Sequence, residues 1–254
     1  MILNSVMLAS GKLYYFEAGK GPALLFLHGA MVTPEAYLPL LTLLAKHYRV
    51  IAPMHPGHGS SFTIADTWKV ANIADFYLDF LADIGFAPQT VIGHSFGGTI
   101  ALLLAARGVG KRVVVCNAPY IPFILDPKRY LSHIGAELRK IYRQRPELKE
   151  IADLAKAARS LAQTIVSHPE DIPRLFAEPK TLDIQADLGR IAIPIYILWG
   201  SEDKIVPVLM ATGLQKAVVG SKLTVFSGLT HYYPVTEPDF TYQEIMKVCP
   251  VDRI

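Results

Sequence analysis

Short, continuously apolar segments alternate with longer amphipathic segments along most of this 254-residue chain. A short apolar run bounded by turn residues is typical of a strand that is buried on both faces. Apolar residues at helical spacing indicate an amphipathic helix, and in residues 66–84 they include Val70, Ile73, Tyr77 and Leu81. Because buried strands that alternate with helices form parallel sheets, we predict an α/β fold with a mostly parallel central β-sheet flanked by helices.

The pattern assigns a residue range to each expected element. The expected strands are 6–9, 13–18, 22–27, 48–52, 90–93, 112–117, 193–198 and 223–226. The expected helices are 34–47, 66–84, 96–107, 128–145, 146–168, 208–217 and 240–248, with shorter helical pieces in 169–189. No strand pattern occurs between residues 119 and 190. We therefore predict an α/β core formed by residues 1–118 and 191–254, with residues 119–190 inserted as a helical cap within the same unit.

Composition argues against several classes of protein. The chain has 25 Lys and Arg against 22 Asp and Glu, and a net charge of +3 is too small to indicate nucleic-acid binding. Cys116 and Cys249 are too few for a disulfide framework or a four-cysteine zinc site. Residues 84–106 are uncharged, but glycines and polar residues interrupt them, which argues against membrane insertion. The N-terminus lacks the layout of a signal peptide, so we expect a cytoplasmic protein of undetermined oligomeric state.

One pentapeptide carries the clearest chemical signal. Gly93-His94-Ser95-Phe96-Gly97 matches the pattern G-x-S-x-G and lies between an expected strand and an expected helix. In that position the glycines allow the strand and the helix to approach closely, and the serine oxygen projects from a strained turn. We therefore take Ser95 as a candidate nucleophile. An ordinary strand-to-helix turn with a serine cap is the alternative, and we expect the His94 side chain to pack away from the nucleophile.

A serine becomes a good nucleophile only when a base takes its proton. His231 follows the last expected strand, and Asp203 follows the strand expected at 193–198. Loops at the carboxyl ends of parallel strands face one crevice, where a carboxylate can orient an imidazole. The chain order Ser95, Asp203, His231 is the order expected for this arrangement. Glu202, next to Asp203, is the alternative acid.

Several segments together resemble the α/β-hydrolase superfamily, in particular its capped esterases and lipases. They are Leu27-His28-Gly29-Ala30, Pro56-Gly57-His58-Gly59-Ser60, the pentapeptide with Gly98, Trp199-Gly200-Ser201-Glu202-Asp203, and Gly228-Leu229-Thr230-His231. The resemblance implies a triad of Ser95, His231 and Asp203, and an oxyanion hole formed by the N–H groups of Ala30 and Phe96. The adjacent Met31 is equally able to donate in place of Ala30.

The chain departs from the family pattern at one position. The family often carries a structural aspartate where this chain has Met54, so we expect a reorganised loop. Whether His55 supplies the missing polar contact is open at this point.

The expected activity is hydrolysis of carboxylic esters with small to medium hydrophobic acyl groups, through an acyl-enzyme on Ser95. The apolar segment that opens the insertion makes Phe123 and Leu125 candidate substrate-binding residues, although it fits a buried hinge equally well. A C–C bond hydrolase, a lyase, a perhydrolase or a non-turnover ligand-binding receptor are alternatives on this fold. The sequence contains no metal-ligand spacing and no nucleotide-binding motif, so we expect neither a metal nor a cofactor.

Overall fold

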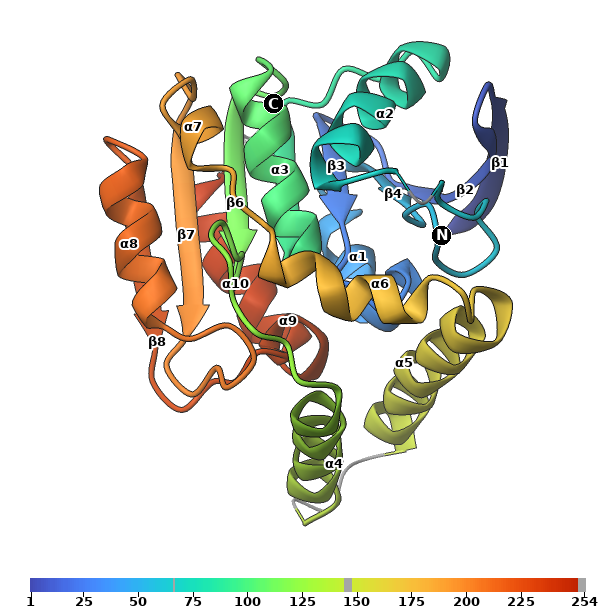
Figure 1. The fold of residues 1–254 in the computed structure, drawn as a ribbon, viewed down its shortest axis with the longest axis vertical. Coiled ribbons are helices and arrows are strands. Elements are labelled where there is room, and N and C mark those ends of the chain that lie inside the picture. Colours follow the sequence, from blue (N-terminus) through green and yellow to red (C-terminus); the bar gives the residue numbers. More distant parts are fainter. Residues whose placement is uncertain (66, 144–147, 251–254) are drawn as a thin grey trace.

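One sheet of eight strands forms the centre of the molecule (Figure 1). The computed structural model describes residues 1–65, 67–143 and 148–250, except for the side chains of residues 129, 138–143, 149, 150 and 154. The strands are β1 (Ile2–Leu8), β2 (Gly11–Ala18), β3 (Ala23–Leu27), β4 (Arg49–Pro53), β5 (Thr90–His94), β6 (Arg112–Cys116), β7 (Ile195–Gly200) and β8 (Lys222–Phe226). Their order across the sheet is β1-β2-β4-β3-β5-β6-β7-β8.

The sheet is parallel from β4 to β8 and antiparallel at its other edge. β1 pairs with β2 as a hairpin, and β2 pairs antiparallel with β4. The remaining neighbours pair in parallel, and the buried residues of β3, β5 and β6 carry the continuous apolar runs seen in the sequence. This arrangement confirms the predicted mostly parallel α/β sheet.

Helices cover both faces of the sheet, as Figure 1 shows. α2 (Val70–Asp83), α3 (Phe96–Ala106) and α8 (Leu209–Ala217) pack into one apolar core. α1 (Leu38–Leu44), which follows the 3₁₀ turn η1 (Pro34–Tyr37), packs with α10 (Pro238–Val248) into a second core on the other face. α2 begins later than expected, because the Asn72 side chain accepts a hydrogen bond of 2.8 Å from the Lys69 N–H and caps the helix there. α9 (Tyr233–Thr236) is a short helix that the sequence pattern did not predict.

Between β6 and β7 the chain is helical in all of its described regular structure. The elements are α4 (Pro127–Arg143), α5 (Leu148–Ser167), α6 (Ile172–Ala177), η2 (Glu178–Lys180) and α7 (Gln185–Leu188). The expected boundary between the first two helices falls on residues 144–147, which lie outside the described residues. In Figure 1, α4 and α5 lie beyond the ends of the strand arrows. The insertion therefore stands over the carboxyl ends of the parallel strands.

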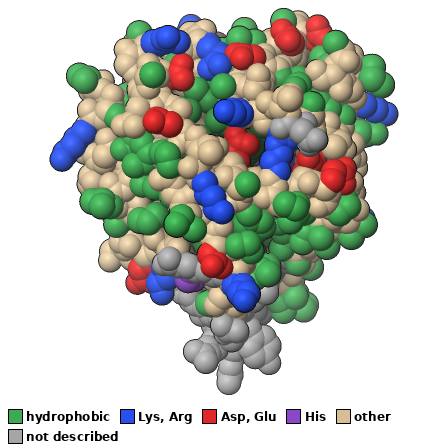
Figure 2. Space-filling model, viewed as in Figure 1, with side chains coloured by type: hydrophobic (Ala, Val, Ile, Leu, Met, Phe, Trp, Pro, Cys, Tyr) green, Lys and Arg blue, Asp and Glu red, His purple; other side chains and the backbone are tan. Residues whose placement is uncertain are grey.

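Two properties of the structure bear on the expectations about charge and membrane insertion. Basic and acidic side chains are interspersed over the face seen in Figure 2 and are not separated by sign. Among the described residues, no helix combines the length and the hydropathy needed to cross a membrane.

The register of the sheet brings four loops together at one edge. His94 at the end of β5 pairs with Cys116 at the end of β6, and Gly200 pairs with Phe226 at the end of β8. Parallel strands in register place the loops that follow them side by side. Ser95, Asn117, Asp203 and His231 all belong to these loops.

Candidate active site

Ser95 occupies a tight turn between β5 and α3, with φ of 51° and ψ of −119°. Its N–H donates to the Cys116 carbonyl at 2.8 Å, which anchors the turn to the sheet. A Cβ atom on Gly93 would lie 2.3 Å from the Gly97 carbonyl oxygen, and one on Gly97 would lie 2.2 Å from that of Leu27. Only glycine fits at these two positions, so the pattern seen in the sequence is a steric requirement of the turn. Strained backbone of this kind persists where the surrounding structure holds it, often at a functional site.

Asp203 and His231 form a buried hydrogen-bonded pair in the loops that follow β7 and β8. His231 Nδ1 lies 2.6 Å from Asp203 Oδ2, and the Asp203 side chain is fully buried. The other carboxylate oxygen, Oδ1, accepts hydrogen bonds of 2.8 Å from the N–H groups of Ile205 and Val206. Because a carboxylate only accepts, Nδ1 of His231 carries the hydrogen and Nε2 is left as the basic nitrogen. Glu202, the alternative acid, has an exposed side chain.

A cavity of about 320 Å³ joins these residues to the helical insertion. Ser95, His231 and Ala30 line it on the side of the core. Phe123 and Leu125 line it on the side of the insertion, and the apolar wall continues over α5 and α6 with residues such as Leu161, Ile165, Leu175 and Phe176. Glu137 is the only carboxylate among the described residues of the wall. The cavity therefore has a largely apolar wall that extends to Ser95.

In the loop after β3, hydrogen bonding distinguishes Ala30 from Met31 as the candidate donor to the oxyanion hole. The Met31 N–H donates to His58 Nε2 at 3.1 Å, and Met31 has a positive φ of 71°. Within the described part of the chain, the N–H groups of Ala30 and Phe96 make no hydrogen bond. Ala30 thus has a free donor beside Ser95, whereas the donor of Met31 is already used.

Three buried histidines brace this loop and the loop after β4. His28 Nδ1 donates to the Gly29 carbonyl at 2.7 Å, and its Nε2 accepts the His55 N–H at 2.9 Å. His55 Nε2 donates to the His28 carbonyl at 2.8 Å, and its Nδ1 accepts the Tyr77 hydroxyl at 2.5 Å. His58 Nδ1 donates to the Pro56 carbonyl at 3.1 Å. His55 therefore does make polar contacts beside Met54, and each ring needs one protonated and one free nitrogen.

These contacts predict that acid destabilises the protein. Burial lowers the pKa of His55 to about 3 and of His58 to about 4, and holds the pKa of His28 well below 6.5. The unfolded chain takes up these protons near pH 6.5, whereas the folded protein does not. The contribution of these neutral histidines to the free energy of unfolding is therefore fully present above pH 6.5. It falls as the pH drops toward 4, by about 1.4 kcal/mol per pH unit for each histidine.

The measurement is the free energy of unfolding in urea between pH 7.5 and 4.5. His58→Gln keeps an acceptor for the Met31 N–H and removes one titrating group, so its slope should be smaller by one proton. A wild-type free energy that stays constant over this range would contradict the prediction.

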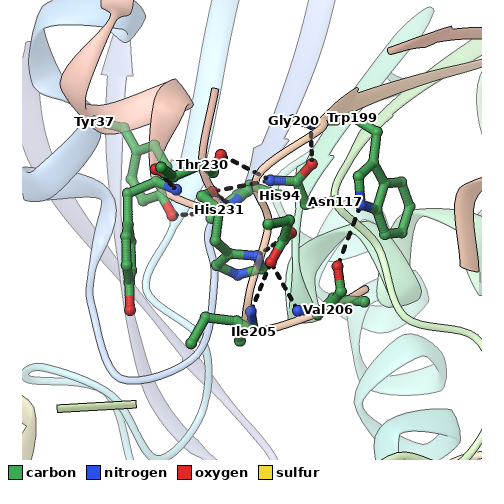
Figure 3. Close-up of polar contacts among 11 residues, drawn as sticks. Tyr37, His94, Asn117, Trp199, Gly200, Ile205, Val206, Thr230 and His231 are labelled. Atoms are coloured by element: carbon green, nitrogen blue, oxygen red, sulfur yellow. Dashed lines mark hydrogen bonds and ion pairs between the residues drawn. The ribbon is translucent and has the colours of Figure 1, made fainter. Parts of the chain in front are cut away.

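The structure also brings in site residues that the sequence did not single out. Tyr37 and Asn117 are connected with His94 and His231 through hydrogen bonds, drawn in Figure 3. His94 is hydrogen bonded at both ring nitrogens and lines the cavity with Ser95, whereas we expected its side chain only to pack away from the nucleophile. Asn117 follows the end of β6, the kind of position that singled out Asp203, and the same rule would have found it. No local sequence signal marks Tyr37.

One group of side chains away from Ser95 in the sequence could hold a metal ion. His168, Glu170 and Asp171 bring potential ligand atoms within 4.8 Å of one another. His168 Nδ1 lies 3.7 Å from Asp171 Oδ2, and His168 Nε2 is hydrogen bonded to the Gly59 carbonyl at 3.1 Å. Among the described residues, Asp171 Oδ2 is buried without a hydrogen-bond partner, and none of these three residues lines the cavity.

The sheet, the serine turn and the helical insertion define an enzyme class, the hydrolases built on a mostly parallel α/β sheet. The chain belongs to the alpha/beta hydrolase family, whose sequence profile matches residues 24–244.

Known relatives differ in the compounds that their names describe. The chain is 30% identical to (E)-2-((N-methylformamido)methylene)succinate hydrolase of Acinetobacter baylyi over 47% of each protein. It is 26% identical to pimeloyl-[acyl-carrier protein] methyl ester esterase of Vibrio vulnificus, over 91% of this chain and 95% of the esterase. The structure of an enol-lactonase from Burkholderia xenovorans superposes with a TM-score of 0.81 at 17% identity, covering 98% of this chain and all of that one (100%). The relatives thus include an esterase, and the fold is also shared with a protein that is only 17% identical in sequence.

Proposed function

We propose that this protein is a serine hydrolase that cleaves carboxylic esters with small to medium hydrophobic acyl groups. The observation that carries the proposal is the placement of Ser95 and His231 in one cavity, with His231 hydrogen bonded to the buried Asp203 at 2.6 Å. His231 Nε2 takes the proton of Ser95 as the hydroxyl oxygen attacks the acyl carbon. His231 then gives that proton to the leaving alcohol, and water releases the acyl group from Ser95 by the same route.

Ala30 and Phe96 form the oxyanion hole in this mechanism. Their N–H groups are free of other partners among the described residues, so they can donate to the negative oxygen of the tetrahedral intermediate. Donors that are already in place need no reorganisation when the charge develops. The N-terminus of α3, where Phe96 lies, also favours negative charge.

A fluorophosphonate probe tests the nucleophile directly. Such a probe reacts quickly only with a serine that a base has activated, so we expect covalent labelling of Ser95, located by mass spectrometry of the peptides. Steady turnover of p-nitrophenyl acetate should accompany it, which also separates an enzyme from a ligand-binding receptor. Labelling of Ser95→Ala protein at the wild-type rate would show that another residue is the nucleophile.

The helical insertion acts as a cap that selects the acyl group. Phe123 and Leu125 line the same cavity as Ser95, and both are half-buried. Each methylene that the wall removes from water contributes about 0.8 kcal/mol to binding. Phe123→Ala or Leu125→Ala should therefore lower kcat/KM for p-nitrophenyl hexanoate about 10-fold and leave the acetate ester nearly unchanged.

The comparison of the two esters is internally controlled, because both use the same nucleophile. Ile124→Ala is a matched control, since the Ile124 side chain is 79% exposed between the two wall residues. An equal loss on acetate and hexanoate would assign Phe123 and Leu125 to the stability of the insertion and not to the acyl pocket.

A further inference from the structure

The main-chain carbonyl of His231 accepts two hydrogen bonds from buried side chains (Figure 3). His94 Nε2 lies 2.9 Å from this oxygen, and Asn117 Nδ2 lies 3.0 Å from it. Because a carbonyl oxygen only accepts, both side chains donate, and His94 must carry its hydrogen on Nε2. The backbone of the proposed base is thus held from two sides.

The first of these contacts leads to the oxyanion loop. With Nε2 protonated, His94 Nδ1 is free to accept, and the Tyr37 hydroxyl donates to it at 2.6 Å. The Tyr37 oxygen in turn accepts the Gly29 N–H at 3.1 Å, and Gly29 directly precedes Ala30. His94 also directly precedes Ser95. The hydrogen bonds therefore run in one direction from the oxyanion loop to His231, past the nucleophile.

The second contact leads to the loop of the acid. Asn117 Oδ1 accepts the Gly200 N–H at 3.0 Å, at the end of β7. The Gly200 carbonyl accepts the Asp203 N–H at 3.2 Å. Asn117 itself has a positive φ of 51°, a conformation that asparagine tolerates better than most residues. The carbonyl of His231 therefore joins the oxyanion loop to the acid loop.

We propose that Tyr37, His94 and Asn117 are positioning residues that keep His231, Asp203 and the oxyanion loop in one fixed geometry. The inference rests on the proposed function of Ser95, His231 and Asp203. All three side chains are almost fully buried, so any hydrogen bond that one of them loses is not replaced by water. A displacement of about 1 Å between reacting groups can lower a rate about 100-fold. Loss of one of these hydrogen bonds is therefore expected to lower kcat.

Tyr37→Phe removes one hydroxyl and tests the first contact. His94 Nδ1 and the Gly29 N–H then both lose their partner, so the oxyanion loop is no longer tied to the imidazole that holds the His231 carbonyl. We expect kcat for p-nitrophenyl acetate to fall about 10- to 100-fold with KM little changed. The proton resonance of His231 Nδ1–H, observed by NMR, should shift or broaden in the same variant.

Asn117→Asp tests the second contact with an isosteric change. An aspartate still accepts the Gly200 N–H, but it places a second oxygen where Nδ2 donated to the His231 carbonyl. We expect kcat to fall at least as far as in Tyr37→Phe. Tyr48→Phe is the matched control, because the buried Tyr48 hydroxyl donates to the Cys249 carbonyl at 2.5 Å and takes no part in this network.

A loss of kcat in Tyr37→Phe and Asn117→Asp, together with near-wild-type Tyr48→Phe, would support the inference. It is wrong if Tyr37→Phe keeps the wild-type kcat and resonance, or if Tyr48→Phe loses as much as Tyr37→Phe. Turnover by Ser95→Ala at the wild-type rate would instead refute the proposed function. In that case the His231 resonance alone decides whether the three residues hold the imidazole.

Discussion

Ser95→Ala is expected to lower kcat for p-nitrophenyl acetate by about 10⁶-fold, the size of effect seen when the nucleophile of a serine protease is removed. The fold should be unchanged, because the structural requirements of the turn fall on the backbone of Ser95 and on the glycines that flank it. The Ser95 N–H keeps its bond to the Cys116 carbonyl when the side chain is shortened. The residual kcat is measured in discontinuous assays at high enzyme concentration. The variant protein must be free of contaminating wild-type enzyme.

The melting temperature and the residual turnover of Ser95→Ala show whether the loss of kcat is a loss of chemistry. The variant should keep its melting temperature within a few degrees, which separates loss of chemistry from loss of fold. Residual turnover above the uncatalysed rate is expected from the oxyanion hole and the cavity. A loss of less than about 100-fold would mean that attack by the Ser95 oxygen is not the main route.

Asp203→Asn is expected to lower kcat by about 10⁴-fold. The amide can still accept the N–H groups of Ile205 and Val206 at the position of Oδ1, so the loop should keep its shape. At the position of Oδ2, however, an NH₂ group would meet Nδ1 of His231. The imidazole would then carry its hydrogen on Nε2, where it must instead be basic in order to deprotonate Ser95.

Glu202→Gln is the matched control for this change. Glu202 is adjacent in the chain and exposed, and its N–H donates to the Leu229 carbonyl through the backbone, which the substitution leaves in place. Its kcat should stay near the wild-type value. Steady-state kinetics between pH 6 and 9 compares the two variants, and an active Asp203→Asn would transfer the role of the acid to another carboxylate.

The sheet and the three principal site residues could be predicted because each rests on a local signal. The apolar runs give the strands directly, and a polar residue just after such a strand lies at the carboxyl edge of a parallel sheet. The same rule places Ser95, Asp203 and His231 at one edge. It does not choose between neighbours such as Glu202 and Asp203, since that depends on which side chain the loop turns inward.

The remaining parts of the site depend on contacts between distant segments. The choice between Ala30 and Met31 follows from the ring of His58, which captures the Met31 N–H across 27 residues of chain. The support from Tyr37 depends on a hydroxyl that reaches His94 across 57 residues. The antiparallel pairing of β2 with β4 is likewise a contact between elements that the periodicity treats separately. Periodicity and local motifs in the sequence do not predict contacts between such distant segments.

The place of the helical insertion also bears on how proteins of this design diversify. The chain leaves the sheet at Cys116, the last residue of β6, and returns to it at Ile195, the first residue of β7, and these two strands are neighbours in the sheet. The pairing of β6 with β7 therefore fixes where both attachment points lie, whatever stands between them. Doubling the length of a connecting segment costs only about 0.6 kcal/mol in closure entropy. Exchange, lengthening or shortening of this part of the gene can therefore change the wall of the cavity while the sheet and its serine turn stay intact.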